Sequence, residues 1–191
     1  MGQPYTSQVP GTASAVEVAS LGELWGLFPP GPIGPLPGWC EVEGQSLPEP
    51  QKKLLVHQGH MTIALNEHHR SPVQLQVLDR RRWDEVYARR LVLTIPGKQS
   101  PVLFGIMRID LTATPPEARE EILSESKPLG AILIDHGVLR RIESRHYLEL
   151  RPGPLLAGKC GIAAGAPLYG RLATIYCGGR AAVELLEVVI V

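Results

Sequence analysis

The C-terminal run from Tyr169 to Val191, YGRLATIYCGGRAAVELLEVVIV, constrains the fold more than any other part of the chain. Two largely apolar stretches flank Gly178-Gly179, a glycine pair typical of the tight turn of a β-hairpin. Two carboxylates, Glu184 and Glu187, interrupt the second stretch. An ionised carboxylate is costly to remove from water unless it is paired. We therefore expect these acids to have a partner or a task.

Apolar alternation predicts further strands in the rest of the chain. The segment 49–69 is expected to be helical with an interruption near Gly59, and Thr114 is the candidate N-cap of another helix. Helix remains an alternative for residues 130–142. Together these elements predict an α+β fold on a mainly antiparallel sheet. The expected strands cover residues 72–78, 87–95, 102–111, 130–142, 146–153 and the terminal hairpin.

The first fifty residues differ from the rest, because they hold half of the prolines and no Lys or Arg. We expect residues 1–49 to form a Pro/Gly-rich N-terminal arm, with a short helix at 16–27, and residues 50–191 to form the folded domain. Docking of the arm on the body and a partly ordered tail both remain open. Docking is favoured by three aromatic residues, Trp25, Phe28 and Trp39.

Charge and composition limit the function classes. Nineteen basic and nineteen acidic side chains give no net charge, so neither nucleic acid nor a membrane is an expected partner. The arginine-rich segment 79–90 is interpreted as a solvated turn, because acids interleave with its arginines. Three scattered cysteines fit a reducing compartment, and six histidines lack the spacing of a metal site. We expect a soluble cytoplasmic protein with no metal.

Strand alternation assigns the charged residues to faces. Arg89 shares a face with Leu91 and Leu93, whereas Arg90 lies on the other face. Both faces of the last strand look covered, so alternation does not choose between Glu184 and Glu187. Two interpretations stay open. One is a direct ion pair or an arginine bound to backbone carbonyls, and the other is a closed pocket in which an arginine grips a ligand carboxylate.

Several stretches together resemble the chorismate pyruvate-lyase family, which converts chorismate to 4-hydroxybenzoate and pyruvate, including its more divergent bacterial branch. The resemblance runs from about residue 50 to the C-terminus. It rests on the order of the matching stretches, which are Met61-Thr62 after LLVHQG, VYARRLVL at 86–93, Pro128-Leu129-Gly130 after a helix, and the terminal hairpin ending at Glu187.

The resemblance implies an antiparallel sheet with helical flaps over an internal ligand pocket. It implies that Arg89 binds the ring carboxylate, that Leu129 contacts the ligand through its main chain with Gly130 beside it, and that Glu187 faces the hydroxyl end of the ring. Arg89 and Glu187 are therefore the predicted catalytic residues. Glu184 is then interpreted as a structural or edge-exposed acid.

One position departs from the better-known bacterial lyases, which have a Gly-Arg-Thr stretch where this chain has Gly105-Ile106-Met107. Chorismate carries two carboxylates, so a second cation is expected. Arg108 is the predicted residue, with Arg171 and Arg90 as further candidates. The alternative for all three is a solvated surface charge.

The predicted function is a carbon–oxygen lyase that acts on chorismate, with Glu187 as the acid and no metal or organic cofactor. One alternative is a non-catalytic small-molecule sensor, because ligand-binding UTRA domains of transcription regulators use the same fold. Those domains normally follow a helix-turn-helix, which the start of this chain lacks. Another is a lyase-like enzyme on a related enolpyruvyl or hydroxybenzoate compound. The pathway, the oligomeric state and the role of the arm stay open.

Overall fold

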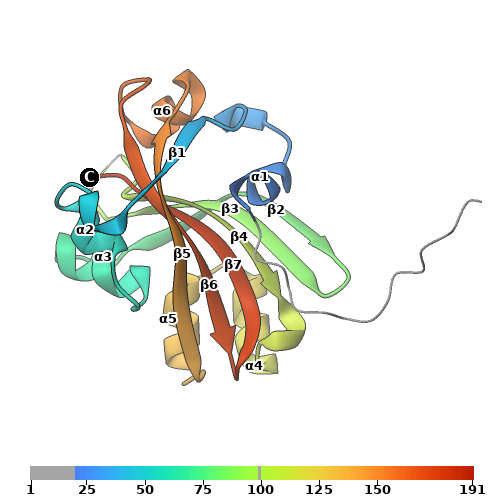
Figure 1. The fold of residues 1–191 in the computed structure, drawn as a ribbon. Helices are drawn as coiled ribbons and strands as arrows, with labels where there is room; N and C mark the ends of the chain where they lie inside the picture. Colours follow the sequence, from blue (N-terminus) through green and yellow to red (C-terminus); the bar gives the residue numbers. More distant parts are fainter. Residues whose placement is uncertain (1–19, 99) are drawn as a thin grey trace, which may run out of the picture.

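The structure is a computed structural model, which describes residues 20–98 and 100–191. Within these residues, seven strands form one antiparallel sheet in the order β1-β5-β6-β7-β4-β3-β2 (Figure 1). Each neighbouring pair in the sheet is antiparallel. The strands are β1 (Gly38–Val42), β2 (Gln74–Trp83), β3 (Val86–Thr94), β4 (Leu103–Asp110), β5 (Arg140–Arg151), β6 (Leu168–Cys177) and β7 (Arg180–Val189).

Short helices cover the sheet on both sides. Together with the antiparallel sheet they confirm the predicted α+β class. The helices are α1 (Leu21–Gly26), α2 (Gln51–Leu55), α3 (Met61–His69), α4 (Pro116–Ser124), α5 (Leu129–Asp135) and α6 (Pro154–Cys160), with 3-10 turns η1 (Gly31–Ile33), η2 (Gly44–Ser46) and η3 (Leu111–Ala113). None of the described helices is both long and apolar enough to cross a membrane.

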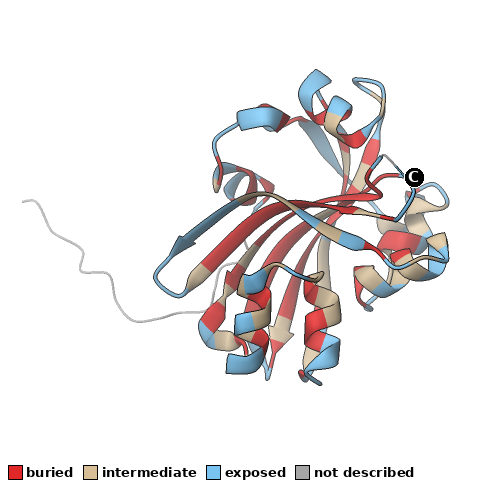
Figure 2. Ribbon diagram, turned by 180° about the vertical axis from the view of Figure 1, so that it is seen from behind, coloured by how far each residue is buried: buried red, intermediate tan, exposed pale blue. Residues whose placement is uncertain are grey.

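Two hydrophobic clusters lie on opposite faces of the sheet. Helices α2, α3, α4 and α5 contribute to the first cluster, which we call the cavity face. The second cluster, on the outer face, receives α1, η1 and α6. Figure 2 shows that the central strands are mostly buried, whereas β2 at the sheet edge is exposed over much of its length. Because both faces are covered, the middle strands carry apolar residues at nearly every position.

The predicted alternation in β3 is confirmed. Leu91 and Leu93 belong to the cluster on the cavity face, and Ala88 and Val92 belong to the cluster on the outer face. Arg89 and Arg90 are adjacent in sequence and therefore point to opposite faces. Both are almost completely buried, with exposed fractions of 0% and 1%.

Three favoured local predictions differ from the structure. Residues 129–135 form helix α5, the alternative to the favoured strand, and this helix buries Leu129, Ile132 and Leu133 at the i, i+3, i+4 spacing of a helix. Thr114 does not cap α4, because its hydroxyl donates to the Leu111 carbonyl at 2.9 Å and Pro115 takes the N-cap position.

The arginine-rich segment is also not a solvated turn along its whole length. Strand β2 continues through it to Trp83, and the turn to β3 contains Asp84, whose φ of 47° is left-handed. An edge strand can carry this many charges because one side of its backbone faces solvent.

The N-terminal part of the described chain packs on the outer face. Of the helix predicted at 16–27, residues 16–19 lie outside the described residues, and α1 begins after Ser20, which forms a capping box with Glu23. Trp25 and Phe28 are buried in the cluster on the outer face. Strand β1 pairs with β5, although its residues fall within the predicted arm. The domain division at residue 50 stays a prediction.

Candidate functional site

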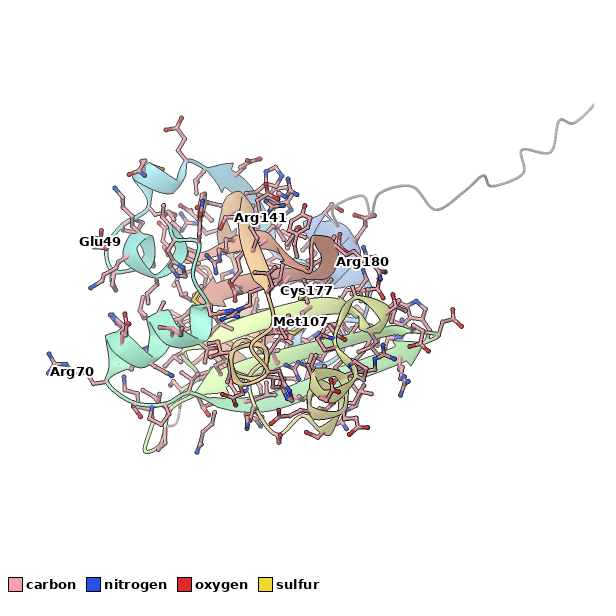
Figure 3. The ribbon with its side chains drawn as sticks, turned by 90° about the horizontal axis from the view of Figure 1, so that it is seen from below. Glu49, Arg70, Met107, Arg141, Cys177 and Arg180 are labelled. Atoms are coloured by element: carbon pink, nitrogen blue, oxygen red, sulfur yellow. The ribbon has the colours of Figure 1, made fainter. Side chains whose placement is uncertain are left out.

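A cavity lies between the sheet and the N-terminal ends of α3 and α5. Met107, which lines it, lies near the middle of the molecule in Figure 3, whereas Glu49 and Arg70 lie at the periphery. Most of the wall is apolar. Its polar side chains are those of His60, Thr62, Arg89, Arg171 and Glu187.

Arg89 is the most unusual residue of this cavity. Its side chain is fully buried, and Nε, Nη1 and Nη2 all lack a hydrogen-bond partner among the described residues. Strand β3 fixes its direction, because Leu91 and Leu93 line the same cavity two and four residues further on. A buried guanidinium without partners is costly. Its position in a cavity makes an anionic ligand the natural partner.

Tyr87 and Glu125 lie close enough to Arg89 to act on its pKa, and neither lines the cavity. The Tyr87 hydroxyl donates to Glu125 Oε1 at 2.5 Å. Burial lowers the pKa of Arg89, while Tyr87 and then Glu125 act in the opposite direction. Both neighbours favour the charged form of Arg89, and the Tyr87 side chain lies close enough to act on its pKa as a hydrogen-bond partner. No guanidinium nitrogen of Arg89 meets both the distance and the angle of a hydrogen bond with a described residue. The pKa of Tyr87 is raised to about 12, first by burial and then by its bond to Glu125.

The second buried arginine of the cavity, Arg171 on β6, is bound by protein groups through Nε and Nη1. Its Nε donates to Glu187 Oε2 on β7 at 2.7 Å. Its Nη1 donates to the carbonyls of Leu55 at 3.0 Å and His57 at 2.9 Å, and contacts Ser144 Oγ at 3.4 Å. Glu187 is thus paired with Arg171 and not with Arg89. Both arginines and the acid line one cavity.

Register places the ion pair and Arg89 at separate ends of the cavity. Glu187 is opposite Arg171 on one side and opposite Gly105 of β4 on the other. Gly105 in turn faces Leu91, two residues from Arg89 on β3. Gly105 lines the cavity and carries no side chain, and side-chain atoms of Leu91 and Leu103 lie 3.4 Å from the position that its Cβ would take.

Leu129 and Gly130, the predicted ligand contacts, line the cavity from the first turn of α5. A Cβ at Gly130 would lie 2.8 Å from Thr62 Oγ1, so a glycine lets α5 approach the start of α3. Neither helix has a side-chain N-cap hydrogen bond. Their first-turn amides are therefore potential donors to the cavity. The ligand roles of Leu129 and Gly130 stay predictions.

His60 precedes α3 and lines the cavity. It is buried rather than on the surface, and Arg140 Nε contacts its Nε2 from β5. The pKa of His60 is lowered to about 4, first by burial and then by Arg140, Arg171 and His57. His60 is therefore neutral at pH 7. No group of three or more potential metal ligands occurs among the residues that the structure describes.

Arg108, the predicted second cation, lies elsewhere. Its Nε donates to Glu184 Oε2 at 2.8 Å, and the two residues are register partners on β4 and β7. Neither lines the cavity. Ile106 belongs to the outer-face cluster and does not line the cavity either. In the structure the side chain of Arg108 is paired with Glu184. Its role in ligand binding stays a prediction.

The interpretation as solvated surface charges is wrong for Arg90 and Arg171, whose exposed fractions are both 1%. Sequence reasoning gave Arg171 too little weight. The signal was present, because alternation places Arg171 on the side of Ala173 and Ile175, and both belong to the cavity-face cluster.

No protein-family model matches this chain, and no curated protein does. Solved structures with a similar fold include the effector domain of PhnF from Mycobacterium smegmatis, which is 16% identical, with 69% of this chain and 88% of that chain covered and a TM-score of 0.48. A GntR-family transcriptional regulator from Bacillus cereus is 14% identical, with 62% and 91% covered and a TM-score of 0.43.

These comparisons correct the predicted activity. The two structures named above are described as an effector domain and as a transcriptional regulator, which corrects the prediction of a carbon–oxygen lyase. Their likeness to this chain shows the fold alone. The resemblance to chorismate pyruvate-lyase has no support from a family model. The structure confirms the predicted α+β fold, and it contains an internal cavity.

Proposed function

We propose that this protein is a non-catalytic small-molecule-sensing domain that binds a small organic acid through Arg89. One observation carries the proposal. Arg89 is fully buried, and all three of its guanidinium nitrogens lack a hydrogen-bond partner among the described residues, while the side chain lines a cavity. A carboxylate can accept two parallel hydrogen bonds from a guanidinium. Such a ligand would satisfy the group that the protein leaves unsatisfied.

The walls of the cavity support an organic rather than an inorganic anion. Leu91, Met107, Leu129 and Leu185 line it beside Arg89. Apolar walls with a few convergent polar groups are typical of small-molecule sites. A ring or short carbon skeleton attached to the carboxylate would bury apolar surface against these side chains, which adds to affinity.

Calorimetric titration of the protein with 4-hydroxybenzoate and related small carboxylic acids tests the proposal. We expect saturable binding, and a loss of affinity of about 100-fold in Arg89→Met, which corresponds to roughly 2.7 kcal/mol. Arg90→Met is the matched control, because Arg90 is equally buried but lies on the outer face. It should bind like the unaltered protein.

The ligand is recovered after the titration and analysed by mass spectrometry. The proposal expects it to be unchanged. Two results would contradict the proposal: equal affinities in the two arginine variants, or conversion of the bound acid to a product.

A further inference from the structure

Resting on the function proposed above, we infer that the cavity selects organic acids that carry one negative charge and discriminates against dianions. The basis is that Glu187 already neutralises the second arginine. Arg171 and Glu187 form a hydrogen-bonded ion pair at 2.7 Å, and both line the same cavity as Arg89. The protein thus supplies its own carboxylate where a second ligand carboxylate would otherwise bind.

The charges of the lining residues support this selection. The ionisable side chains that line the cavity are His60, Arg89, Arg171 and Glu187. His60 is neutral at pH 7, because its pKa is lowered to about 4. Among these lining residues, two guanidinium groups and one carboxylate leave a single net positive charge. Just outside the lining, the charges of Glu125 near Arg89 and of Arg140 against His60 are opposite and offset each other. Charge complementarity therefore favours one negative charge on the ligand.

Arg171 is not free to change partners. Its Nη1 is held by the carbonyls of Leu55 and His57, which connect β6 to the end of α2. The side chains of Arg171 and Glu187 are 1% and 14% exposed, so solvent screens the pair weakly. A ligand carboxylate at this end would have to displace Glu187 or lie beside it as a like charge. Either outcome disfavours a dianion.

The spacing of the strands indicates that a small ring acid bound at Arg89 extends far enough to approach Arg171 and Glu187. Arg89 is on β3 and Glu187 on β7, with β4 between them, which places their backbones roughly 10 Å apart across the sheet at about 4.8 Å per strand. Both residues line the cavity. Gly105 on β4, which lies between their strands, carries no side chain, and the side chains of Leu91 and Leu103 border its Cβ position at 3.4 Å. A benzoate held by Arg89 would therefore direct its opposite edge toward the ion pair.

Three ligands of similar length separate charge from size: 4-hydroxybenzoate, terephthalate and terephthalate monomethyl ester. At pH 7 the first and third carry one negative charge and the second carries two. Calorimetry on the unaltered protein should give affinities for both monoanions at least about 10-fold above that for terephthalate. Equal or tighter binding of terephthalate would overturn the inference.

The variant Glu187→Gln removes one negative charge and keeps the shape of the side chain. We expect this variant to raise the affinity for terephthalate, relative to that for its monomethyl ester, by about 10-fold. The preference for the monoanion would then be smaller or reversed. An unchanged ratio in a folded variant would also overturn the inference. The comparison of the two terephthalates in the unaltered protein needs no variant, so it decides the question if Glu187→Gln does not fold.

The outcomes distinguish this inference from the proposed function. Absence of binding for all three acids contradicts the function proposed for Arg89. Binding of all three with a preference for terephthalate leaves that function intact and contradicts only the selection by charge.

Discussion

Arg89 and Arg90 are neighbours on one strand and are equally buried, yet their surroundings differ. Arg90 points to the outer face, where its guanidinium lies 4.8 Å from the centre of the Phe28 ring and Nη2 donates to the Pro29 carbonyl at 3.1 Å. Arg89 points to the cavity, where no described residue accepts a hydrogen bond from it. Protein groups therefore cover the guanidinium of Arg90, whereas that of Arg89 faces a cavity.

This difference separates a structural arginine from a binding one. Buried arginines usually satisfy themselves with protein groups, as Arg171 does through Glu187 and two carbonyls. Arg90 is satisfied only in part, because Nη2 donates to a carbonyl and the guanidinium lies over an aromatic ring, whereas Nε and Nη1 lack a hydrogen-bond partner among the described residues. Burial alone therefore does not mark a binding residue. The combination of burial, missing partners and a cavity does.

The largest expected effect is on the outer face. Phe28→Ala removes the ring that covers Arg90 and leaves a gap in the outer-face cluster. We expect a loss of about 3 kcal/mol in the free energy of unfolding. Urea denaturation measures it. Ligand affinity should be unchanged, and a large loss of affinity in the folded variant would break the separation between the two faces.

Acid should destabilise the protein through the cavity face. The pKa of His60 is about 4 in the folded protein and 6.5 in the unfolded chain. As the pH falls, the unfolded chain therefore binds the proton before the folded protein does. The contribution is fully present above pH 6.5 and is lost as the pH falls toward 4, by at most about 3–4 kcal/mol. Denaturation curves at pH 7 and 4.5 test this.

The matched variant for this prediction is His60→Gln, which cannot titrate. It should lose less stability than the unaltered protein over the same pH interval. A loss of the same size in both proteins would show that other groups cause the acid sensitivity.

Arg89→Met should raise the free energy of unfolding of the ligand-free protein, by roughly 1–2 kcal/mol, because it removes an unpaired buried charge. Thermal and urea denaturation without ligand measure the change. Arg90→Met should not raise it, since that arginine has protein partners. A destabilised Arg89→Met would mean that Arg89 has an internal partner after all.

The smallest expected effect concerns the charge pair outside the cavity. Arg108 is 29% exposed in its side chain and Glu184 is 6% exposed, so water screens their interaction in part. Arg108→Met should cost about 1 kcal/mol of stability. Calorimetry with 4-hydroxybenzoate should give an unchanged affinity. A loss of affinity above 10-fold would mean that Arg108 contributes to ligand binding.

Sequence alone placed much of the fold and part of this site. Period-two patterns identify the strands that are buried on one or both faces, and they assigned Arg89 and Arg90 to opposite faces correctly. For the segment of helix α5 the sequence favoured a strand and left helix as the alternative, because a brief apolar run fits either structure.

The pairing of charges could not be predicted, because it depends on which strands become neighbours. Arg171 and Glu187 meet only because β6 and β7 pair in the observed register. Arg108 meets Glu184 through the pairing of β4 with β7. Alternation fixes the face of each side chain, but the partner across the sheet is a property of the fold.

A crystal structure of the protein with bound 4-hydroxybenzoate tests the central claim most directly. The quantity to measure is the distance from the ligand carboxylate oxygens to the guanidinium nitrogens of Arg89. We predict two contacts at roughly 2.8 Å, with the ring among the apolar residues of the cavity. A carboxylate bound at Arg171, or a ligand outside the cavity with Arg89 still lacking a partner, would contradict the account.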